Sequence, residues 1–278
     1  MLTLPTPLVS VNWLKENKTS EKLIVLDATI PKVVGGGNIS EKRQIPNAIF
    51  FDLKKVFLDK TGEFPNTIPS AKYFEEQVQK LGIHQDSCIV VYDDLGIYSS
   101  ARVWWLFTIF GFKNIAVLDG GLPAWELAKL PTEKPKEINR LAGNFKAVYN
   151  AAKFTDVQNV LNNIALETFC VADARSEGRF YAKVKEPREG VRGGHIPKSI
   201  SLPYADLQND GFMKSKDELA TIFQKINSNN KPYIFSCGTG ITACILALGL
   251  EITGNSNYAV YDGSWTEWGS LTELPIEQ

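Results

Sequence analysis

The sequence has few histidines and cysteines, which are the side chains that bind zinc in structural sites. Its 278 residues include only two histidines, His84 and His195, and four cysteines. The cysteines are Cys88, Cys170, Cys237 and Cys244. None of them forms a Cys-x-x-Cys pair or a zinc-ligand spacing with the histidines. The cysteines are therefore interpreted as reduced thiols, and we expect no disulfide framework, no metal and no cofactor.

The sequence also lacks an excess of charge, a long apolar run and a targeting signal. Thirty Lys and Arg residues face thirty-one Asp and Glu residues, which gives no global field for nucleic acid or for an anionic membrane. The apolar stretch 103–112 is far shorter than the ~20 residues of a membrane span. The N-terminus has no basic region followed by an apolar one, and no arginine precedes Arg43. These absences predict a cytoplasmic protein with no nucleic-acid or membrane partner.

Three motifs occur twice in the chain, roughly 145 residues apart. The pairs are Leu-Asp-Ala at 26–28 with Ala-Asp-Ala at 172–174, Ile-Pro at 45–46 with Ile-Pro at 196–197, and Asp119-Gly-Gly with Asp262-Gly-Ser, each followed by a tryptophan. A period this long predicts a duplicated domain rather than a solenoid.

A charged, proline-bearing stretch at 129–137 separates the two copies and is typical of a linker. We therefore predict a first domain at 1–130, a linker at 131–150 and a second domain at 151–278.

Each half alternates short apolar runs with segments of helical periodicity. The expected strands are 23–26, 88–92, 115–118, 169–172, 233–236 and 258–261, and the expected helices are 71–81, 99–110, 216–226 and 241–252. Strands that are apolar throughout and alternate with helices indicate a parallel sheet covered on both faces. The predicted fold class is α/β, with two tandem α/β/α domains that each have a mostly parallel central sheet.

Cys237 lies at the corner between an expected strand and an expected helix. Ligands of open parallel sheets bind outside the carboxyl ends of the strands. Gly238 and Gly240 allow a tight loop whose N–H groups can face the sulfur, and the helix adds its positive N-terminal end. This setting favours the thiolate, which is the nucleophilic form of cysteine. The alternative is that Cys237 is a small core residue at a strand end.

The other cysteines are better explained by packing. Cys88 and Cys170 begin strands, and Cys244 lies within an apolar helix. Phosphate-ester hydrolysis is disfavoured, because cysteine phosphatases require an arginine six positions after the nucleophile and this chain has Ala243 there.

Three stretches carry a resemblance to a known family. They are Arg192-Gly-Gly-His-Ile-Pro197, Cys237-Gly-Thr-Gly-Ile-Thr-Ala243 and Asp262-Gly-Ser-Trp-Thr-Glu-Trp268. With two tandem α/β halves, the chain closely resembles the two-domain sulfurtransferases of the rhodanese superfamily, from Leu8 almost to its end. In that family a cysteine of the second domain becomes a persulfide and passes its sulfur on. The resemblance implies that Cys237 is the catalytic cysteine, and that the first domain has no nucleophile because Asp93 stands at the matching position.

The loop after the cysteine bears on the sulfur donor. Thiosulfate sulfurtransferases of this family typically have Arg-Lys there, whereas 3-mercaptopyruvate sulfurtransferases have Gly-Ser-Gly. Here Gly238, Thr239 and Gly240 are similar to the second type, and with Ile241 and Thr242 they form the predicted persulfide loop. The loop has no cationic side chain for the two charges of thiosulfate. We therefore expect 3-mercaptopyruvate as donor, with thiosulfate as the alternative.

Four arginines of the second half lie in one charged segment, 173–192. The resemblance implies that Arg179 and Arg188 bind the carboxylate and keto oxygen of mercaptopyruvate. The alternative is a solvated surface loop with weak ion pairs. Arg175 and Arg192 are expected to have structural roles, and His195 is expected to make a loop hydrogen bond.

In the mercaptopyruvate sulfurtransferases of this family, an acidic residue and a histidine have been suggested as a proton relay, and this sequence has neither residue at those positions. By alignment these fall on Lys54 and Asn66, and Thr239 is the nearest group to hydrogen-bond a substrate. The implied partners are a small-molecule sulfur donor and an acceptor such as cyanide, thioredoxin or a low-molecular-weight thiol. The rival hypothesis is a non-catalytic persulfide carrier that is loaded by a desulfurase.

Overall fold

A computed structural model describes residues 2–30, 42–138 and 140–278, so residue 139 of the predicted linker lies outside the described residues. The chain divides into two compact units. The first unit comprises Met1–Lys60, Ile68–Asn150 and Asp210–Met213. The second unit comprises Thr61–Thr67, Ala151–Asn209 and Lys214–Gln278.

The first unit is built on a five-stranded sheet with the order β1-β5-β4-β2-β3, and all its pairings are parallel. Its strands are β1 (Leu8–Val9), β2 (Leu23–Asp27), β3 (Ile49–Phe50), β4 (Cys88–Tyr92) and β5 (Ile115–Leu118). The three central strands are buried along their whole length. A parallel sheet needs this composition because helices cover both of its faces.

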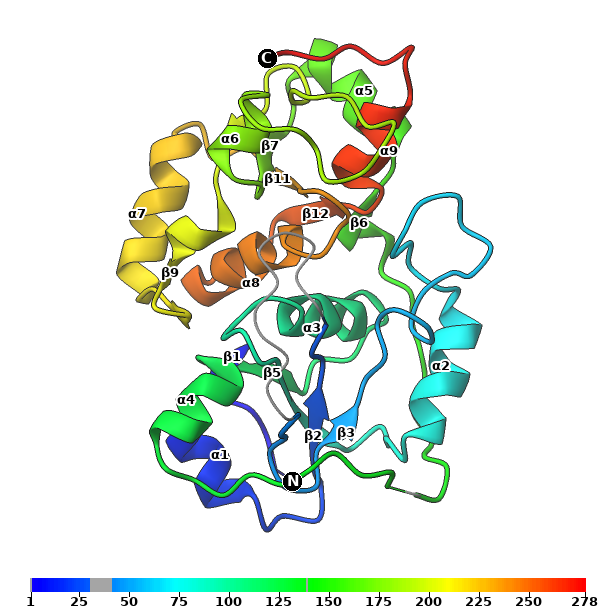
Figure 1. Ribbon diagram of the computed structural model, residues 1–278, viewed down its shortest axis with the longest axis vertical. Helices are drawn as coiled ribbons and strands as arrows, with labels where there is room; N and C mark the ends of the chain where they lie inside the picture. The colour runs from blue at the N-terminus through cyan, green and yellow to red at the C-terminus, as the bar shows by residue number, and fades with distance from the viewer. Residues whose placement is uncertain (1, 31–41, 139) are drawn as a thin grey trace. The chain divides into compact units, whose positions relative to one another are not determined.

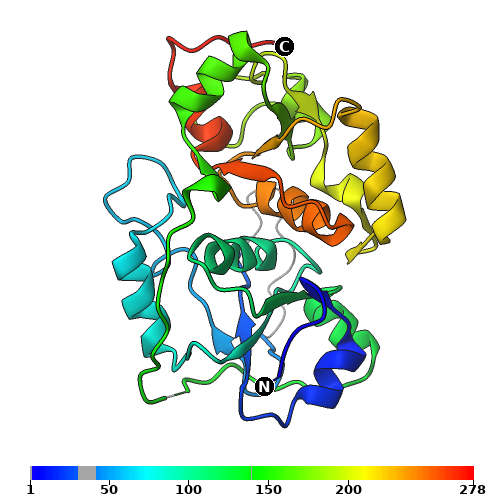
Figure 2. The same cartoon turned by 180° about the vertical axis from the view of Figure 1, so that it is seen from behind.

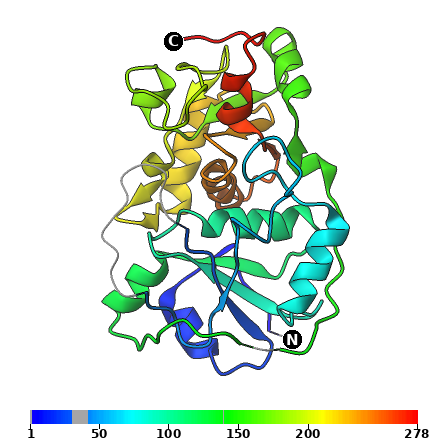
Figure 3. The same ribbon diagram turned by 45° about the vertical axis from the view of Figure 1, so that its right-hand side comes forward.

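Helices lie on both sides of this sheet. They are α1 (Val11–Asn17), α2 (Ala71–Lys80), α3 (Ser100–Ile109) and α4 (Gly121–Leu127). Helices α1 and α4 lie side by side on one side of the strands, and α2 lies on the other (Figures 2 and 3). Ser10 begins α1 and Ser70 begins α2 by accepting a hydrogen bond from a backbone N–H of the first turn.

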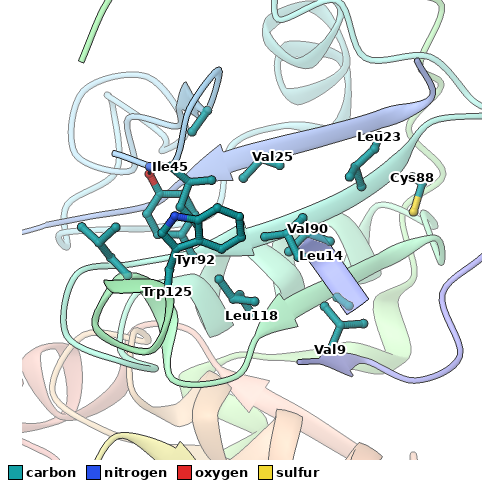
Figure 4. Packing of buried hydrophobic residues seen from close by; sticks show 13 residues of the cluster. Val9, Leu14, Leu23, Val25, Ile45, Cys88, Val90, Tyr92, Leu118 and Trp125 are labelled. Atoms are coloured by element: carbon teal, nitrogen blue, oxygen red, sulfur yellow. Dashed lines mark hydrogen bonds between the residues drawn. The ribbon is translucent and has the colours of Figure 1, made fainter. Parts of the chain in front are cut away.

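The core between the sheet and helices α1 and α4 is apolar. Leu14 of α1 and Trp125 of α4 pack with Val25, Val90 and Leu118 of the strands (Figure 4). Cys88 lies at the beginning of β4 in the same cluster, fully buried. This confirms the prediction that Cys88 is a packing residue.

The second unit has a sheet of the same design, with the order β6-β12-β11-β7-β8 and only parallel pairings. Its strands are β6 (Phe154–Thr155), β7 (Cys170–Asp173), β8 (Ile200–Ser201), β11 (Tyr233–Ser236) and β12 (Tyr258–Tyr261). A further two-residue strand of this unit is β9 (Gln208–Asn209), whereas β10 (Phe212–Met213) belongs to the first unit.

Helices again flank the strands. They are α5 (Val157–Leu166), α6 (Glu177–Phe180), α7 (Lys216–Ile226), α8 (Ala243–Thr253) and α9 (Ser264–Ser270), with 3-10 turns η1 (Ala151–Lys153) and η2 (Tyr204–Leu207). Helices α7 and α8 lie side by side, and α5 and α9 lie on the other side of the sheet (Figure 1). Trp265 and Trp268 of α9 pack with Val160 of α5 in a buried cluster.

The predicted fold class is confirmed: each half is a parallel sheet between helices. The six expected strands and four expected helices all form, with ends within two residues of the predicted ones. No helix among the described residues has the length and apolar character needed to cross a lipid bilayer. Residues 143–150 of the predicted linker form no helix or strand, but their backbone N–H groups bond to α2, α3 and the segments that follow them.

Asp93 occupies the corner after β4 that corresponds to the Cys237 corner after β11. Its carboxylate is fully buried and accepts four hydrogen bonds. The donors are the N–H groups of Leu95, Tyr98 and Ser100 and the hydroxyl of Ser100, at 2.6–3.0 Å. In the first unit this corner therefore holds an anion that belongs to the chain itself.

We predict that Asp93→Asn lowers the free energy of unfolding by about 1–3 kcal/mol, because one amide cannot accept all four bonds and buried donors lose their partner. Urea denaturation of the full chain measures this difference. A variant as stable as wild type would show that the four contacts contribute nothing.

Asp94→Asn removes the same charge from the next residue, and it serves as the control near pH 4, where its stability should equal that of wild type. Partial burial, then the charges of Asp93 and Asp27, raise the pKa of Asp94 to about 6. Because this pKa lies above its unfolded value, ionisation of Asp94 destabilises the fold progressively from about pH 4 to pH 6. Asp94→Asn should match wild type near pH 4 and be more stable at pH 7, by about 0.5 kcal/mol at this exposed position.

Candidate functional site

Cys237 is the residue after β11, and its side chain is buried, with 1% of its surface exposed. The loop 237–242 leads directly into α8, which is buried along almost all its length. Gly240 has a φ of 74°, a left-handed conformation that an L side chain rarely adopts. The predicted corner between strand and helix is therefore present, with the thiol at its beginning.

The hydroxyl of Ser264, the first residue of α9, is hydrogen-bonded to the backbone of this loop. It accepts hydrogen bonds from the N–H groups of Cys237 at 3.1 Å and Gly240 at 3.2 Å, and donates to the carbonyl of Tyr261 at 2.8 Å. The same oxygen lies 3.9 Å from Sγ of Cys237. Ser264 has a φ of 51°, whereas Gly121 stands at the corresponding position of the first unit with a φ of 55°. A serine accepts this strained conformation because its hydroxyl organises the loop.

The carbonyl groups of the loop are also fixed. The N–H of Trp265 donates to the carbonyl of Cys237, and Thr266 donates to that of Gly238 through both its N–H and its hydroxyl. Asn66 is buried and donates from Nδ2 to the carbonyl of Thr239 at 3.2 Å. The backbone of the loop therefore has a single defined path.

Four N–H groups of the loop have no acceptor within the described part of the chain. They belong to Gly238, Thr239, Ile241 and Thr242. Together with the N-terminus of α8, they are donors available to an anionic group bound at the sulfur.

Arg175 is the centre of a buried ion-pair network behind the loop. It donates to both carboxylate oxygens of Asp173, to Glu186 at 2.9 Å and to the carbonyl of Gly194 at 2.9 Å. Its guanidinium also lies 4.3 Å from the ring centroid of Trp265. Burial by itself lowers the pKa of Arg175, but the negative charges of Asp173 and Glu186 more than offset this and raise the pKa overall. The structural role expected for Arg175 is confirmed.

Arg179, on α6, lies over the loop. A Cβ atom added at Gly238 would be 3.1 Å from Nη2 of Arg179 and 3.5 Å from Nη1. Nε and Nη2 of Arg179 donate to the carboxylate of Glu186 at 3.2 and 2.5 Å. Nη1 has no acceptor among the described residues, and 19% of the side chain is exposed. The guanidinium is therefore beside the cysteine loop, with one edge occupied and one edge open.

Arg188 lies in the loop 181–190 and is half-buried. Glu186, two residues earlier, is the partner of Arg175 and Arg179. The alternative interpretation of this segment is a solvated surface loop with weak ion pairs. The side chain of Glu186 does not fit it, because only 4% of that side chain is exposed.

Arg192 and His195 support the fold. Arg192 donates to the carbonyls of Trp268, Gly269, Leu271 and Leu274 at and beyond the end of α9. His195 stacks on Phe180 with ring centroids 3.8 Å apart, and its Nδ1 lies 3.1 Å from the carbonyl of Phe180. The structural roles expected for both residues are confirmed.

The remaining thiols lie in packing positions. Cys170 begins β7, and Cys244 lies in α8, where its Sγ is 3.2 Å from the carbonyl of Gly240. Burial raises the pKa of Cys88 and of Cys170 to about 11, which keeps both protonated near neutrality. Within the described ranges, no group of three His, Cys, Asp or Glu side chains is arranged to hold a metal ion.

Ser264 and Asn66 were not identified from the sequence as contacts of this loop, and Glu186 was not identified as the partner of Arg175 and Arg179. Ser264 had a signal, since it replaces the second glycine of the repeated Asp-Gly-Gly motif. Asn66 was noted only as the position of a family histidine, and Glu186 only as part of a charged segment. Lys54, the other departure from the family, is exposed in the first unit.

Comparison with known proteins identifies relatives along almost the whole chain. The rhodanese-like domain family matches residues 10–128 and 155–271. A 3-mercaptopyruvate sulfurtransferase of Mus musculus is 37% identical over 272 residues, which cover 94% of this chain and 91% of the mouse protein. A thiosulfate sulfurtransferase of Rattus norvegicus is also 37% identical, over 273 residues with the same coverage. Sequence identity therefore does not separate the two donors.

A solved structure has the same fold. The crystal structure of SseA from Escherichia coli, described as a 3-mercaptopyruvate sulfotransferase with the rhodanese fold, superposes with a TM-score of 0.83 and 32% identity. The match covers 94% of this chain and 99% of the other.

We predict that Ser264→Ala lowers the free energy of unfolding by about 1–3 kcal/mol, because two buried N–H groups lose their acceptor. Ser264→Gly should cost about 1 kcal/mol less, because glycine adopts the positive φ without strain. Urea denaturation of both variants measures the contribution of the lost hydrogen bonds and that of the strained backbone conformation.

Ser270→Ala is the control, since the Ser270 hydroxyl donates to the carbonyl of Thr266 within α9 and no N–H depends on it. If Ser264→Ala were no less stable than Ser270→Ala, Ser264 would not organise the loop.

Proposed function

Because the chain belongs to the rhodanese family of two-domain sulfurtransferases, we propose that it moves a sulfur atom from 3-mercaptopyruvate, through a persulfide on Cys237, to a thiol or to cyanide. The observation that carries the proposal is the position of the Cys237 thiol. It lies at the start of a loop in which four N–H groups have no acceptor among the described residues, and the guanidinium of Arg179 lies beside Gly238.

In the proposed reaction, the Cys237 thiolate attacks the sulfur of mercaptopyruvate. A bond forms between the two sulfur atoms, and the bond from sulfur to carbon breaks. The electron pair of that bond passes to the three-carbon fragment, which leaves as the enolate of pyruvate and then takes up a proton. An acceptor thiolate or cyanide next attacks the outer sulfur and regenerates the Cys237 thiolate. The proposed reaction needs no cofactor.

The loop would stabilise the persulfide. A persulfide anion is an acceptor for the N–H groups of Gly238, Thr239, Ile241 and Thr242, which have no other acceptor among the described residues. Gly240 contributes differently, through its positive φ and its N–H bond to Ser264.

Arg179 and Arg188 are the proposed donor-binding residues. Nη1 of Arg179 is free of protein acceptors in the described chain and can donate to the carboxylate of mercaptopyruvate. The second edge of the same guanidinium is held by Glu186, which fixes its orientation. The enolate that forms as the bond to sulfur breaks would be stabilised by a hydrogen bond from the same open Nη1.

Thiosulfate is the second candidate donor, and the rat relative supports it. Two features of the loop favour mercaptopyruvate. The side chains at 238 and 239 are uncharged, and any side chain at 238 would press against the guanidinium of Arg179. A cationic residue at 238 would in addition meet a like charge.

The first domain, proposed as 1–130, would have no nucleophile, since the carboxylate of Asp93 fills its corner. Residues 131–150 would connect it to the catalytic domain at 151–278. The shared strand order supports an origin by tandem duplication. We further propose a cytoplasmic location and an acceptor such as thioredoxin or a low-molecular-weight thiol. A non-catalytic persulfide carrier is the rival, and turnover with small donors and acceptors distinguishes the two.

We predict that incubation with 3-mercaptopyruvate adds one sulfur atom, about 32 Da, to the intact protein, and that Cys237→Ser takes up none. Intact-protein mass spectrometry measures the addition, and peptide mapping locates it.

Cys244→Ser is the control for this experiment, because Cys244 is buried in α8 and its Sγ lies 3.2 Å from the carbonyl of Gly240. It should load as wild type does. Sulfur found on Cys88, Cys170 or Cys244 instead of Cys237 would refute the assignment of the nucleophile.

A second prediction concerns the arginines. Lysine keeps the charge but cannot reproduce the planar donor set, so Arg179→Lys and Arg188→Lys should each lower kcat/KM for mercaptopyruvate roughly 10-fold or more. The same variants should hardly change kcat/KM for thiosulfate, which has no carboxylate. Steady-state kinetics with both donors makes the comparison.

Arg140→Lys is the control, since Arg140 is an exposed arginine of the first unit. Arg140→Lys should leave kcat/KM unchanged for both donors. Equal losses for the two donors in the Arg179 and Arg188 variants, at unchanged Tm, would rule out the carboxylate clamp.

A further inference from the structure

Glu186 is a buried carboxylate that contacts both guanidinium groups of the site. It accepts from Nη1 of Arg175 at 2.9 Å and from Nε and Nη2 of Arg179 at 3.2 and 2.5 Å. Only 4% of its side chain is exposed, compared with 19% for Arg179. The proposed roles of Cys237, Arg179 and Arg188 do not explain why a carboxylate is buried here.

The charges of this network cancel. Asp173 and Glu186 carry two negative charges, and Arg175 and Arg179 carry two positive charges. Asp173 pairs with Arg175 alone, so Glu186 is the carboxylate that neutralises Arg179. The guanidinium beside Gly238 can therefore donate hydrogen bonds while this group of four charges has no net charge.

We infer that Glu186 determines donor specificity: it compensates the charge of Arg179, so that the site accepts a monoanionic carboxylate donor and discriminates against a dianionic sulfur donor. This inference rests on the proposed function. A carboxylate such as that of mercaptopyruvate is bound through the open Nη1 of Arg179, where geometry matters most. A dianion such as thiosulfate gains less at Arg179, because the positive charge of that guanidinium is already paired with Glu186.

The decisive experiment measures the ratio of kcat/KM for thiosulfate to kcat/KM for mercaptopyruvate. Glu186→Gln keeps the shape and removes the negative charge, so the ratio should rise by about 10-fold at low ionic strength, through a lower KM for thiosulfate. Added salt should reduce this rise. Glu186→Asp keeps the charge and changes the reach, so its ratio should stay within about 2-fold of wild type even if both rates fall.

Glu189→Gln is the matched control. It removes the same charge from an exposed position three residues further along the same loop. Its ratio should equal that of wild type. If the role of Glu186 were purely structural, Glu186→Gln would lower kcat/KM for both donors by the same factor. The ratio would then be unchanged, and this result would overturn the inference.

A binding measurement separates this inference from the proposed function, because it needs no turnover. Alkylation of Cys237 by iodoacetamide is followed with sulfate, a dianion, or pyruvate, a monoanion, as protecting ligand. In wild type, pyruvate should protect at concentrations at least about 10-fold lower than sulfate, and in Glu186→Gln this preference should largely disappear.

The outcomes of the two measurements are distinct. Wild-type protein that does not turn over mercaptopyruvate but shows the protection pattern would refute the proposed donor and retain the charge discrimination. Equal protection of wild type by sulfate and pyruvate would overturn the inference. This second measurement also applies if Glu186→Gln does not fold.

Discussion

The guanidinium of Arg175 joins four segments of the second unit. It binds the carboxylate of Asp173 at the end of β7, Glu186 in the loop 181–190, the carbonyl of Gly194, and the ring of Trp265 in α9. Trp265 in turn donates to the carbonyl of Cys237. A buried cation is tolerated only when it is fully paired, so these segments must keep their places together. The position of the cysteine loop therefore depends on a charge that does not face it.

The two sheets show how one backbone frame can serve two purposes. At the corner after β4, four donors surround the carboxylate of Asp93, and the anion is part of the chain. At the corner after β11, Cys237 stands in place of the aspartate, and several N–H groups of the loop keep no acceptor among the described residues. The frame that stabilises an internal anion in one unit is thus open to an anion formed on sulfur in the other.

The fold could be predicted from the sequence because its signals are local. Apolar runs such as Cys88–Tyr92, and helical periods such as Lys216–Ile226, lie within one element each. The two-residue strands at the sheet edges were missed, because a pair of residues has no periodicity. The contacts of Glu186, Ser264 and Asn66 were missed for a different reason. Those of Ser264 and Asn66 join residues 24 to 173 positions apart, and no local pattern encodes such a contact. Those of Glu186 span only 7 and 11 positions, but they lie in an irregular loop with no periodicity to indicate which charges pair.

Glu186 also explains how an arginine can lie beside the loop without occupying it. An unpaired guanidinium near a thiolate would bind it directly, and the resulting ion pair would stabilise the resting state of the nucleophile as well as the transition state. Paired with Glu186, Arg179 would have little net attraction for a thiolate formed at Cys237, but it retains directed N–H donors at Nη1. In the proposed reaction, charge that develops on bound mercaptopyruvate would then meet N–H groups that are already oriented, so the pairing would favour the transition state over the resting state.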